Sequence, residues 1–173
     1  MATTPLIDAP TRTTYAHGRA RPSARDELDA HLRLQHRVDL LPSLVDGCHH
    51  ASVTTVTGGR LTVRVSTDRT ARRADELQDA LGEGPCLQSV RTGHSVVAAD
   101  LRTETRWTRW CAEAVSDLGL TGALSVLLVS NLRPLATLNL YSDTVGGLAE
   151  LDLAHLHTLT APLSSVLLRR LAR

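Results

Sequence analysis

Apolar residues recur at helical spacing near the start of this chain, after a first segment that lacks such a pattern. Ser23 is followed by Asp26 and Glu27, which favours a helix start because Ser caps free backbone amides and acids suit the positive end of the helix dipole. An apolar stripe follows before Pro42: Leu28, Leu32, Leu34, Val38 and Leu41. The pattern predicts helical structure over Ser23–Val45.

The next region alternates apolar and polar residues, which is the period of a half-buried β-strand. Cys48–Thr57 and Arg60–Ser66 flank two glycines, and this arrangement predicts a hairpin. In the second strand Leu61, Val63 and Val65 alternate with polar residues. A regular strand would place these three side chains on one face.

A second hairpin is predicted where Gly122–Val129 and Leu135–Tyr141 flank a turn at residues 131–133. Val96-Val97 indicates a brief strand. Apolar periodicity and flanking glycines predict four further helices: Asp68–Leu81, Cys86–Arg91, Trp107–Leu118 and Leu148–Leu171. Pro162 should kink or break the last of them. The order of elements predicts an antiparallel sheet flanked by helices, the α+β class.

The composition changes the expected core. All 19 basic residues are arginine, and Phe is absent. The interior must therefore be built from Leu, Val and Ala, with Trp107, Trp110 and Tyr141 as its few large rings. The formal net charge of +1 favours no partner of either sign, so we expect no direct nucleic-acid binding.

Nothing in the chain indicates a membrane or secreted protein. No apolar run approaches the roughly 18 residues of a membrane span, and the N-terminus lacks the apolar region of a secretory signal. Cys48, Cys86 and Cys111 form no paired framework, as expected of reduced thiols in a cytoplasmic protein. Residues 1–22 are rich in Thr, Pro, Arg and Ala without apolar periodicity, and they predict a disordered tail.

The segment from Leu81 to Tyr141 is the most informative part of the chain. It reads LGEGPCLQSVRTGHSVVAADLRTETRWTRW, then LGLTGALSVLL, then PLATLNLYS. These phrases and the order of elements closely resemble a GAF domain, of the type found in actinobacterial regulators and often fused to an ANTAR RNA-binding output domain. The resemblance spans about Leu28–Leu171, although typical members have a Gly within the segment Pro134–Thr137.

The resemblance implies a GAF-like, PAS-related fold with an antiparallel sheet of about five or six strands. The terminal helices would lie on one face, and the helices near Cys86 and Trp107 would cover a ligand pocket on the other. The GAF domain would occupy residues 23–173 with no ANTAR domain, either as a stand-alone protein or as an excised sensor. The implied function is small-molecule sensing without enzymatic activity, in regulation of transcription or antitermination, through dimerisation or a partner.

Two features point to a ligand site. Thr137, Asn139 and Tyr141 share one face of the last strand, and a polar triplet there is unexpected for a pure core. Trp107 and Trp110 lie on one side of a helix beside an Arg-rich loop, where they suit an apolar pocket with a cationic rim, although core packing explains them equally well. The predicted ligand-binding residues are Cys86, Trp107, Trp110, Asn139 and Tyr141. The sequence names neither the ligand nor a cofactor.

The cysteines raise three further hypotheses. Cys86 follows Gly-Pro at a helix start, where a lowered thiol pKa would suit a redox sensor; the alternative is a packed, inert thiol. Free methionine sulfoxide reductases are GAF-based enzymes with paired cysteines, but the spacing of Cys86 and Cys111 does not match that family, so we expect no enzyme. Cys48 and His50 would share a strand face without a third ligand, so no metal site is predicted.

The Leu-rich faces of the first and last helices predict self-association. GAF domains often pair their terminal helices in a dimeric bundle, and each leucine fully buried there contributes roughly 1.5–3 kcal/mol. We expect a homodimer through Leu28–Val45 and Leu156–Leu171, or a regulatory protein partner on the same faces. If the sheet's pocket is filled by side chains, an interaction scaffold without a ligand is the alternative function.

Overall fold

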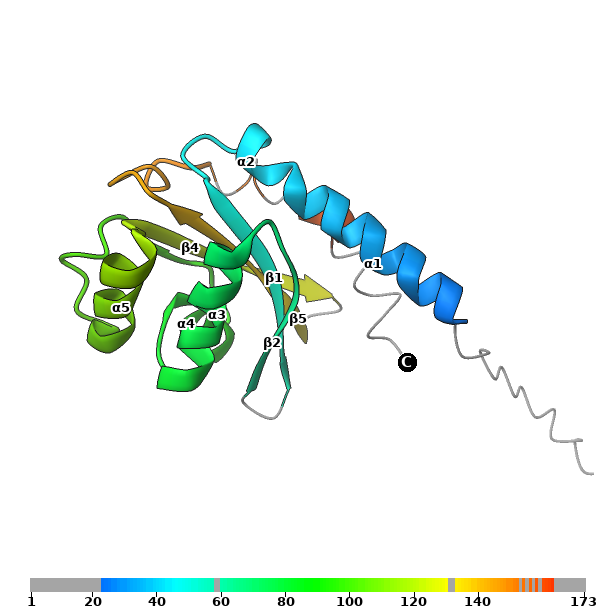
Figure 1. Ribbon diagram of the computed structural model, residues 1–173, viewed down its shortest axis with the longest axis horizontal. Coiled ribbons are helices and arrows are strands. Elements are labelled where there is room, and N and C mark those ends of the chain that lie inside the picture. Colours follow the sequence, from blue (N-terminus) through cyan, green and yellow to red (C-terminus); the bar gives the residue numbers. More distant parts are fainter. Residues whose placement is uncertain are drawn as a thin grey trace, which may run out of the picture.

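The computed structural model describes residues 23–57, 60–130, 133–152, 154, 156, 158 and 160–163. The helices are α1 (Ala24–Asp39), α2 (Leu41–Leu44), α3 (Arg69–Leu81), α4 (Pro85–Thr92) and α5 (Thr108–Leu118). The strands are β1 (His50–Thr57), β2 (Arg60–Ser66), β3 (Val96–Ala98), β4 (Gly122–Ser130) and β5 (Arg133–Ser142). Within the described residues they form a five-stranded antiparallel sheet in the order β2-β1-β5-β4-β3 (Figure 1), which confirms the predicted α+β class.

Local signals in the sequence set most helix bounds. The hydroxyl of Ser23 accepts a 3.2 Å hydrogen bond from the Asp26 amide, and the Asp26 carboxylate accepts one of 3.0 Å from the Ser23 amide, which together form a capping box. Asp68 caps α3 by accepting a 2.9 Å hydrogen bond from the Ala71 amide. α3 ends at Gly82, whose φ of +70° is readily adopted only by glycine.

One face of the sheet packs against α1 and the described residues of the C-terminal segment. Leu34 and Val38 of α1, together with Leu156 and Leu163 from the C-terminal segment, join a single buried cluster with the strand residues on that face, including Leu138. The predicted placement of both terminal segments on one face is thus confirmed. The opposite face is covered by α3, α4 and α5, which lie side by side over it (Figure 1).

A bulge in β2 changes the predicted facing of its side chains. The register passes from Val53 opposite Val65 to Thr54 opposite Val63, so Arg64 is an extra residue in β2. Because Val53 and Thr54 face opposite sides of the sheet, Val63 and Val65 also do. The expectation that Leu61, Val63 and Val65 share one face is therefore wrong: Val65 joins the core beneath α1, while the other two border α3.

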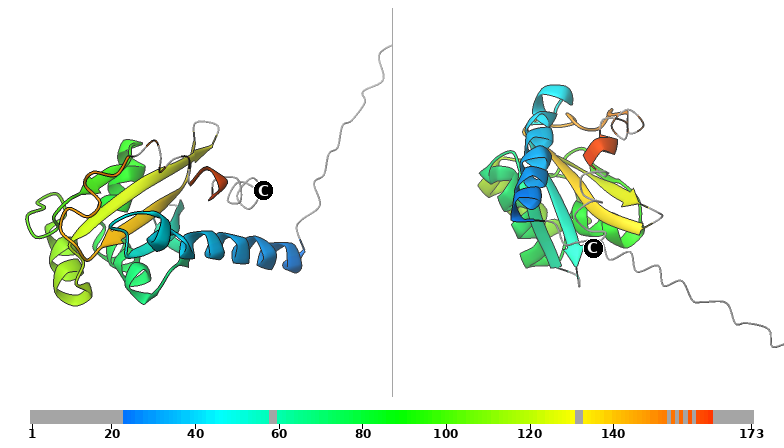
Figure 2. Two further views of the ribbon diagram at one scale, coloured as in Figure 1. Left: turned by 90° about the horizontal axis from the view of Figure 1, so that it is seen from above. Right: turned by 90° about the vertical axis from the view of Figure 1, so that its right-hand side faces the viewer.

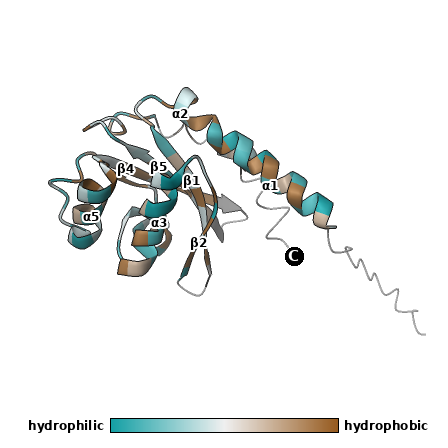
Figure 3. Ribbon diagram, viewed as in Figure 1, coloured by the Kyte–Doolittle hydropathy of each residue, from teal (hydrophilic) through white to brown (hydrophobic). Residues whose placement is uncertain are grey.

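The first predicted helix is two helices with a projecting end. α1 stops at Asp39, and α2 follows with Pro42 in its first turn. Two views show the N-terminal part of α1 extending beyond the sheet, with hydrophobic residues recurring along it (Figures 2 and 3). Leu28 and Leu32 accordingly remain 56% and 55% exposed.

The closing helix begins later than its periodicity predicts. Residues 148–150 form turns, whereas the described residues at 154, 156, 158 and 160–163 are helical, Pro162 included. Asp152 explains this start, because its carboxylate accepts a 2.8 Å hydrogen bond from the Ala154 amide and its carbonyl accepts one of 2.9 Å from the Leu156 amide. The predicted tail at 1–22, the turn residues 131–132 and the end of this helix lie outside the described residues. None of the helices in the described part has the length and apolar composition needed to cross a membrane.

Candidate functional site

Polar side chains occupy the middle of the sheet on the face covered by α3 and α4. They come from alternate positions of β1 and β5, with one residue from β4, and each is fully buried: Ser52, Thr54, Ser125, Thr137, Asn139 and Tyr141. Alternation along a strand sends these residues to one face and the intervening apolar residues to the other. With Asp75 and Gln78 of α3 and Cys86 of α4, they form what we call the polar cluster.

Asp75 lies at the centre of the polar cluster. Its carboxylate accepts hydrogen bonds of 2.5 Å from the Ser52 hydroxyl, 2.9 Å from the Asn139 amide and 2.5 Å from the Tyr141 phenol. Burial raises the pKa of Asp75 from 3.8 to about 7, and these hydrogen bonds partly offset the shift. The site therefore contains a buried acid that can exchange a proton near neutral pH.

Gln78 connects α3 to both β5 and α4. Its amide nitrogen donates a 3.0 Å hydrogen bond to the Tyr141 hydroxyl, and its carbonyl oxygen accepts one of 2.8 Å from the Cys86 amide. Just before α4, the backbone at Gly84 passes close to the Gln78 side chain. A Cβ on Gly84 would overlap the Gln78 side chain, and Gly84 has a φ of +136°. Glycine at this position thus permits the contact that satisfies both polar ends of Gln78.

Cys86 contributes a thiol that is buried and hydrogen-bonded. Its sulfur lies 2.9 Å from the Thr137 hydroxyl and 3.3 Å from that of Thr54, and the two hydroxyls are 2.6 Å apart. Burial, together with the nearby charge of Asp75, raises the pKa of Cys86 to about 11. Because the thiolate is the reactive form, this environment gives no support to the redox-sensor alternative.

The two tryptophans lie on the same side of the sheet as the polar cluster, at the start of α5. The rings of Trp110 and Tyr141 are 6.4 Å apart, those of Trp107 and Trp110 are 6.2 Å apart, and the Trp110 indole donates a 3.0 Å hydrogen bond to the Ala74 carbonyl. The guanidinium of Arg106 lies over the Trp107 ring, with its carbon 4.4 Å from the ring centroid.

The five predicted site residues therefore lie on one side of the sheet. Cys86, Asn139 and Tyr141 belong to one hydrogen-bonded cluster, and the tryptophans are linked to it through Tyr141. Their binding of a ligand stays a prediction. Sequence reasoning missed Asp75 and Gln78, although both are polar positions on the face of α3 that carries Ala71, Ala74 and Leu77.

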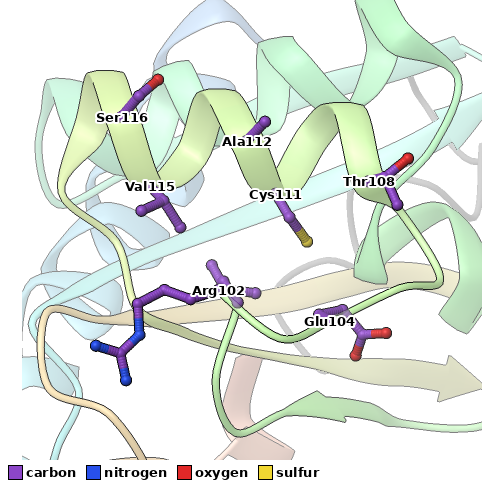
Figure 4. A pocket seen from close by; sticks show the side chains of 8 residues that line it. Arg102, Glu104, Thr108, Cys111, Ala112, Val115 and Ser116 are labelled. Carbon is purple, nitrogen blue, oxygen red and sulfur yellow. The ribbon is translucent and has the colours of Figure 1, made fainter.

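Within the described residues, cavities adjoin α3 and α5. One, of about 310 Å³, lies between β2 and α3 and is bordered by Asp75. The other, of about 390 Å³, lies between α5 and the loop before it (Figure 4). The Cys111 sulfur points into this second space, with Val115 beside it and Arg102 across from it (Figure 4). This cavity is bordered by an acid, Glu104, as well as by Arg102, and Arg102 pairs with Asp100, so its rim is not simply cationic; the tryptophans do not line it.

Cys48 and His50 do not lie on one face of the sheet. Cys48 is buried in the core beneath α1, whereas His50 faces α3, so the expectation that they share a face is wrong. The reason is that β1 begins only at His50, and the residues before it do not follow strand alternation. Across the part of the chain that the structure describes, no group of three or more His, Cys, Asp or Glu side chains is placed to hold a metal ion.

Comparison with known proteins identifies the family to which this antiparallel sheet with its covered polar face belongs. The family model for the GAF domain matches residues 34–167, and the chain belongs to this family. GAF domains are commonly sensory or signalling domains. No curated protein matches the chain.

Solved structures with the same fold share little sequence. A type II free methionine-R-sulfoxide reductase from Thermoplasma acidophilum is 14% identical with a TM-score of 0.68, covering 83% of this chain and 96% of its own. The GAF domain region of a Geobacter sulfurreducens PCA protein is 15% identical with a TM-score of 0.61, covering 83% and 93%. A reduced free methionine-R-sulfoxide reductase from Staphylococcus aureus is 13% identical with a TM-score of 0.60, also covering 83% and 93%.

These similarities contradict the expectation that the chain is not an enzyme. Free methionine-R-sulfoxide reductases recur among the similar structures, from Thermoplasma acidophilum, Neisseria meningitidis and Staphylococcus aureus. Proteins with this fold therefore include enzymes, and membership of the GAF family is no argument against an activity. At 13–17% identity the likeness shows the fold alone.

Proposed function

We propose that this GAF domain is a signalling sensor that binds a small molecule at the polar cluster. The observation that carries the proposal is the full burial of Ser52, Thr54, Thr137 and Asn139 on the two central strands, around the carboxylate of Asp75. Interior positions of a sheet normally favour apolar side chains, because buried polar groups lower stability unless they are paired. Binding of a ligand would account for polar side chains at these buried positions.

The chemistry of the cluster favours a ligand that donates hydrogen bonds. Asp75 is an acceptor when ionised, and the groups that hydrogen-bond to it are uncharged hydroxyls and an amide. The adjoining cavity is bordered by Glu76 and Asp79 as well as by Arg72, so acids outnumber bases there. An anion would be repelled by the carboxylate, whereas a neutral or cationic donor would satisfy it. The cavity of about 310 Å³ between β2 and α3 borders Asp75 and offers a route of approach.

A second candidate function is an interaction module without a ligand. The observation in its favour is that the polar side chains already pair with one another, as the 2.6 Å contact between Thr54 and Thr137 illustrates. Such a cluster would fix the packing of α3 and α4 on the sheet, and signalling would then depend only on the outer surfaces.

Output through a second copy of the chain, or through a regulatory protein, completes the proposal. Leu28, Leu32, Leu40 and Leu44 are 42–57% exposed along α1 and α2. Exposed apolar residues on a projecting helix suit helix pairing, since each leucine removed from water is favourable. Regulation of transcription or antitermination is proposed as the process, from the resemblance to domains coupled to ANTAR outputs.

Native mass spectrometry of the purified protein tests the ligand proposal. We expect a bound small molecule in the unmodified protein and its loss in Tyr141→Phe, which keeps the ring but removes the hydroxyl that contacts Asp75 and Gln78. Leu138→Ala is the matched control, because Leu138 is fully buried on the opposite face of the sheet. It tests whether lost stability alone releases the molecule.

The proposal fails if the unmodified protein carries no small molecule and a metabolite extract leaves its unfolding temperature unchanged. The interaction module would then be the better reading. Loss of the molecule in both variants would mean that lost stability alone releases it, and the assignment of its site to the polar cluster would fail.

A further inference from the structure

His50 lies outside the polar cluster and contacts two carboxylates. It is the first residue of β1, and its Nδ1 is 2.8 Å from an Asp68 oxygen while its Nε2 is 3.2 Å from an Asp143 oxygen. The imidazole is 19% exposed, and the carboxylates of Asp68 and Asp143 are 37% and 49% exposed. Both ring nitrogens therefore face acceptors.

The two contacts differ between the protonated and the neutral ring. A neutral imidazole has one N–H donor and one lone pair, whereas an ionised carboxylate only accepts. A neutral His50 could donate to Asp68 or to Asp143, and its other nitrogen would face the second carboxylate with a lone pair. Only the imidazolium donates to both at once.

Asp68 is the more firmly held of the two carboxylates. It also accepts hydrogen bonds of 2.9 Å from the Ala71 amide and 2.8 Å from the Thr67 hydroxyl. Although desolvation opposes the effect, the hydrogen bonds from Ala71, His50 and Thr67 keep the pKa of Asp68 below its usual value. Asp143 has the longer contact with His50 and the greater exposure, so it is the partner that a neutral ring would lose.

The neighbouring His49 contacts the same segment through a ring nitrogen that accepts a hydrogen bond. Its Nδ1 accepts a 3.1 Å hydrogen bond from the Asp143 amide and lies 3.4 Å from the Ser142 hydroxyl. An accepting Nδ1 requires a neutral ring. The other titratable groups close to His50 are Cys48, whose thiol donates a 3.5 Å hydrogen bond to the His50 carbonyl, and Tyr141, its register partner on β5.

We propose that His50 is a proton-operated clasp between the helix that covers the polar cluster and the segment leading to the C-terminal helical residues. Asp68 is the N-cap of α3, which carries Asp75 and Gln78. Asp143 directly follows β5 and begins that segment. The charged ring holds both ends together; loss of its proton releases Asp143 and loosens residues 143–147.

Amide hydrogen exchange measured by NMR between pH 6 and pH 8.5 tests the clasp. The probes are the amides of Gly146 and Gly147, which bond to the Ala99 and Thr144 carbonyls at 2.9 and 3.1 Å. After correction for intrinsic exchange, we expect their protection to fall about fivefold across this range in the unmodified protein, the scale of one partly exposed ion pair. Ring ¹⁵N shifts of His50, recorded on the same samples, report whether the loss of protection follows the loss of the ring proton.

Asp143→Asn is the decisive variant, because the Asn amide can donate to the lone pair of a neutral ring. It should keep the bridge at both pH values and make the protection of Gly146 and Gly147 independent of pH. His50→Gln, which donates from one end only, should show low protection throughout. The proposal is overturned if the unmodified protein shows no pH dependence, or if Asp143→Asn follows the same profile as the unmodified protein.

Discussion

The phenol of Tyr141 donates a 2.5 Å hydrogen bond to the carboxylate of Asp75, and both residues are fully buried. The groups that donate hydrogen bonds to the carboxylate, from Ser52, Asn139 and Tyr141, are neutral, and the charge of Arg72 adds a smaller stabilisation of its ionised form. Burial and the charge of Asp75 also raise the pKa of Tyr141 well above its usual value. The pair therefore joins α3 to β5 through a bond whose strength depends on the Asp75 proton.

The pH dependence of stability should change in Asp75→Asn. Because the pKa of Asp75 rises on folding from 3.8 to about 7, the stability that its proton contributes is complete below about pH 4 and is lost as the pH rises through about 7. Asn keeps an acceptor for Asn139 and Tyr141, and its amide can donate to the Ser52 hydroxyl. Thermal unfolding should show a higher midpoint than the unmodified protein at pH 8 and no gain at pH 5.

Asp117→Asn is the control for this experiment, since Asp117 is an exposed carboxyl on α5. It should leave the pH profile unchanged. If Asp75→Asn lowers the midpoint equally at both pH values, then lost hydrogen bonds outweigh the removed charge, and the buried proton is not a determinant of stability.

Gly84→Ala should destabilise the protein more than Gly82→Ala. Both glycines have positive φ angles, of +136° and +70°, but a Cβ on Gly84 would overlap the Gln78 side chain, whereas one on Gly82 would meet nothing within 4 Å. We expect an extra loss of about 1–3 kcal/mol in the free energy of unfolding for Gly84→Ala, measured by urea denaturation. Equal losses would mean that the Gln78 contact adjusts freely.

The thiols should react slowly in the folded protein. Burial raises the pKa of Cys48 and Cys111 to about 12, and that of Cys86 to about 11, so all three are protonated at pH 7.5. We expect iodoacetamide to label Cys111 first, because it borders the cavity beside α5, and all three rapidly in urea. Labelling is followed by peptide mass spectrometry. Native labelling of Cys86 as fast as in urea would restore the redox hypothesis.

Charges on the projecting part of α1 should abolish self-association. Leu28→Glu with Leu32→Glu places two carboxylates on side chains that are 56% and 55% exposed, so the fold should survive while a dimer does not. Sedimentation at micromolar concentration is expected to show a dimer for the unmodified protein and a monomer for the double variant. Val97→Glu, at a 43% exposed position on β3, is the control and should remain dimeric. A monomeric unmodified protein would rule out this interface.

The sequence by itself determined the elements whose signals are local. Ser23 with Asp26 marks the start of α1, glycines mark the ends of α3, α4 and α5, and alternation marks the strands. The facing of Thr137, Asn139 and Tyr141 was also predictable, because strand alternation depends only on neighbours in the chain. Local steric and hydrogen-bonding preferences act over a few residues, so they can be predicted from the sequence.

Only the tertiary structure decided which polar groups meet. Asp75 lies 23 positions from Ser52 and 66 from Tyr141, and no local pattern selects those partners among many possible ones. Likewise, His50 reaches Asp68 and Asp143 across 18 and 93 positions. The extra residue at Arg64 turns Val65 to the other face by a change of register that strand alternation does not predict. These features depend on how β1, β5 and α3 pack together, since desolvation and hydrogen bonding at a distance exist only after the chain has folded.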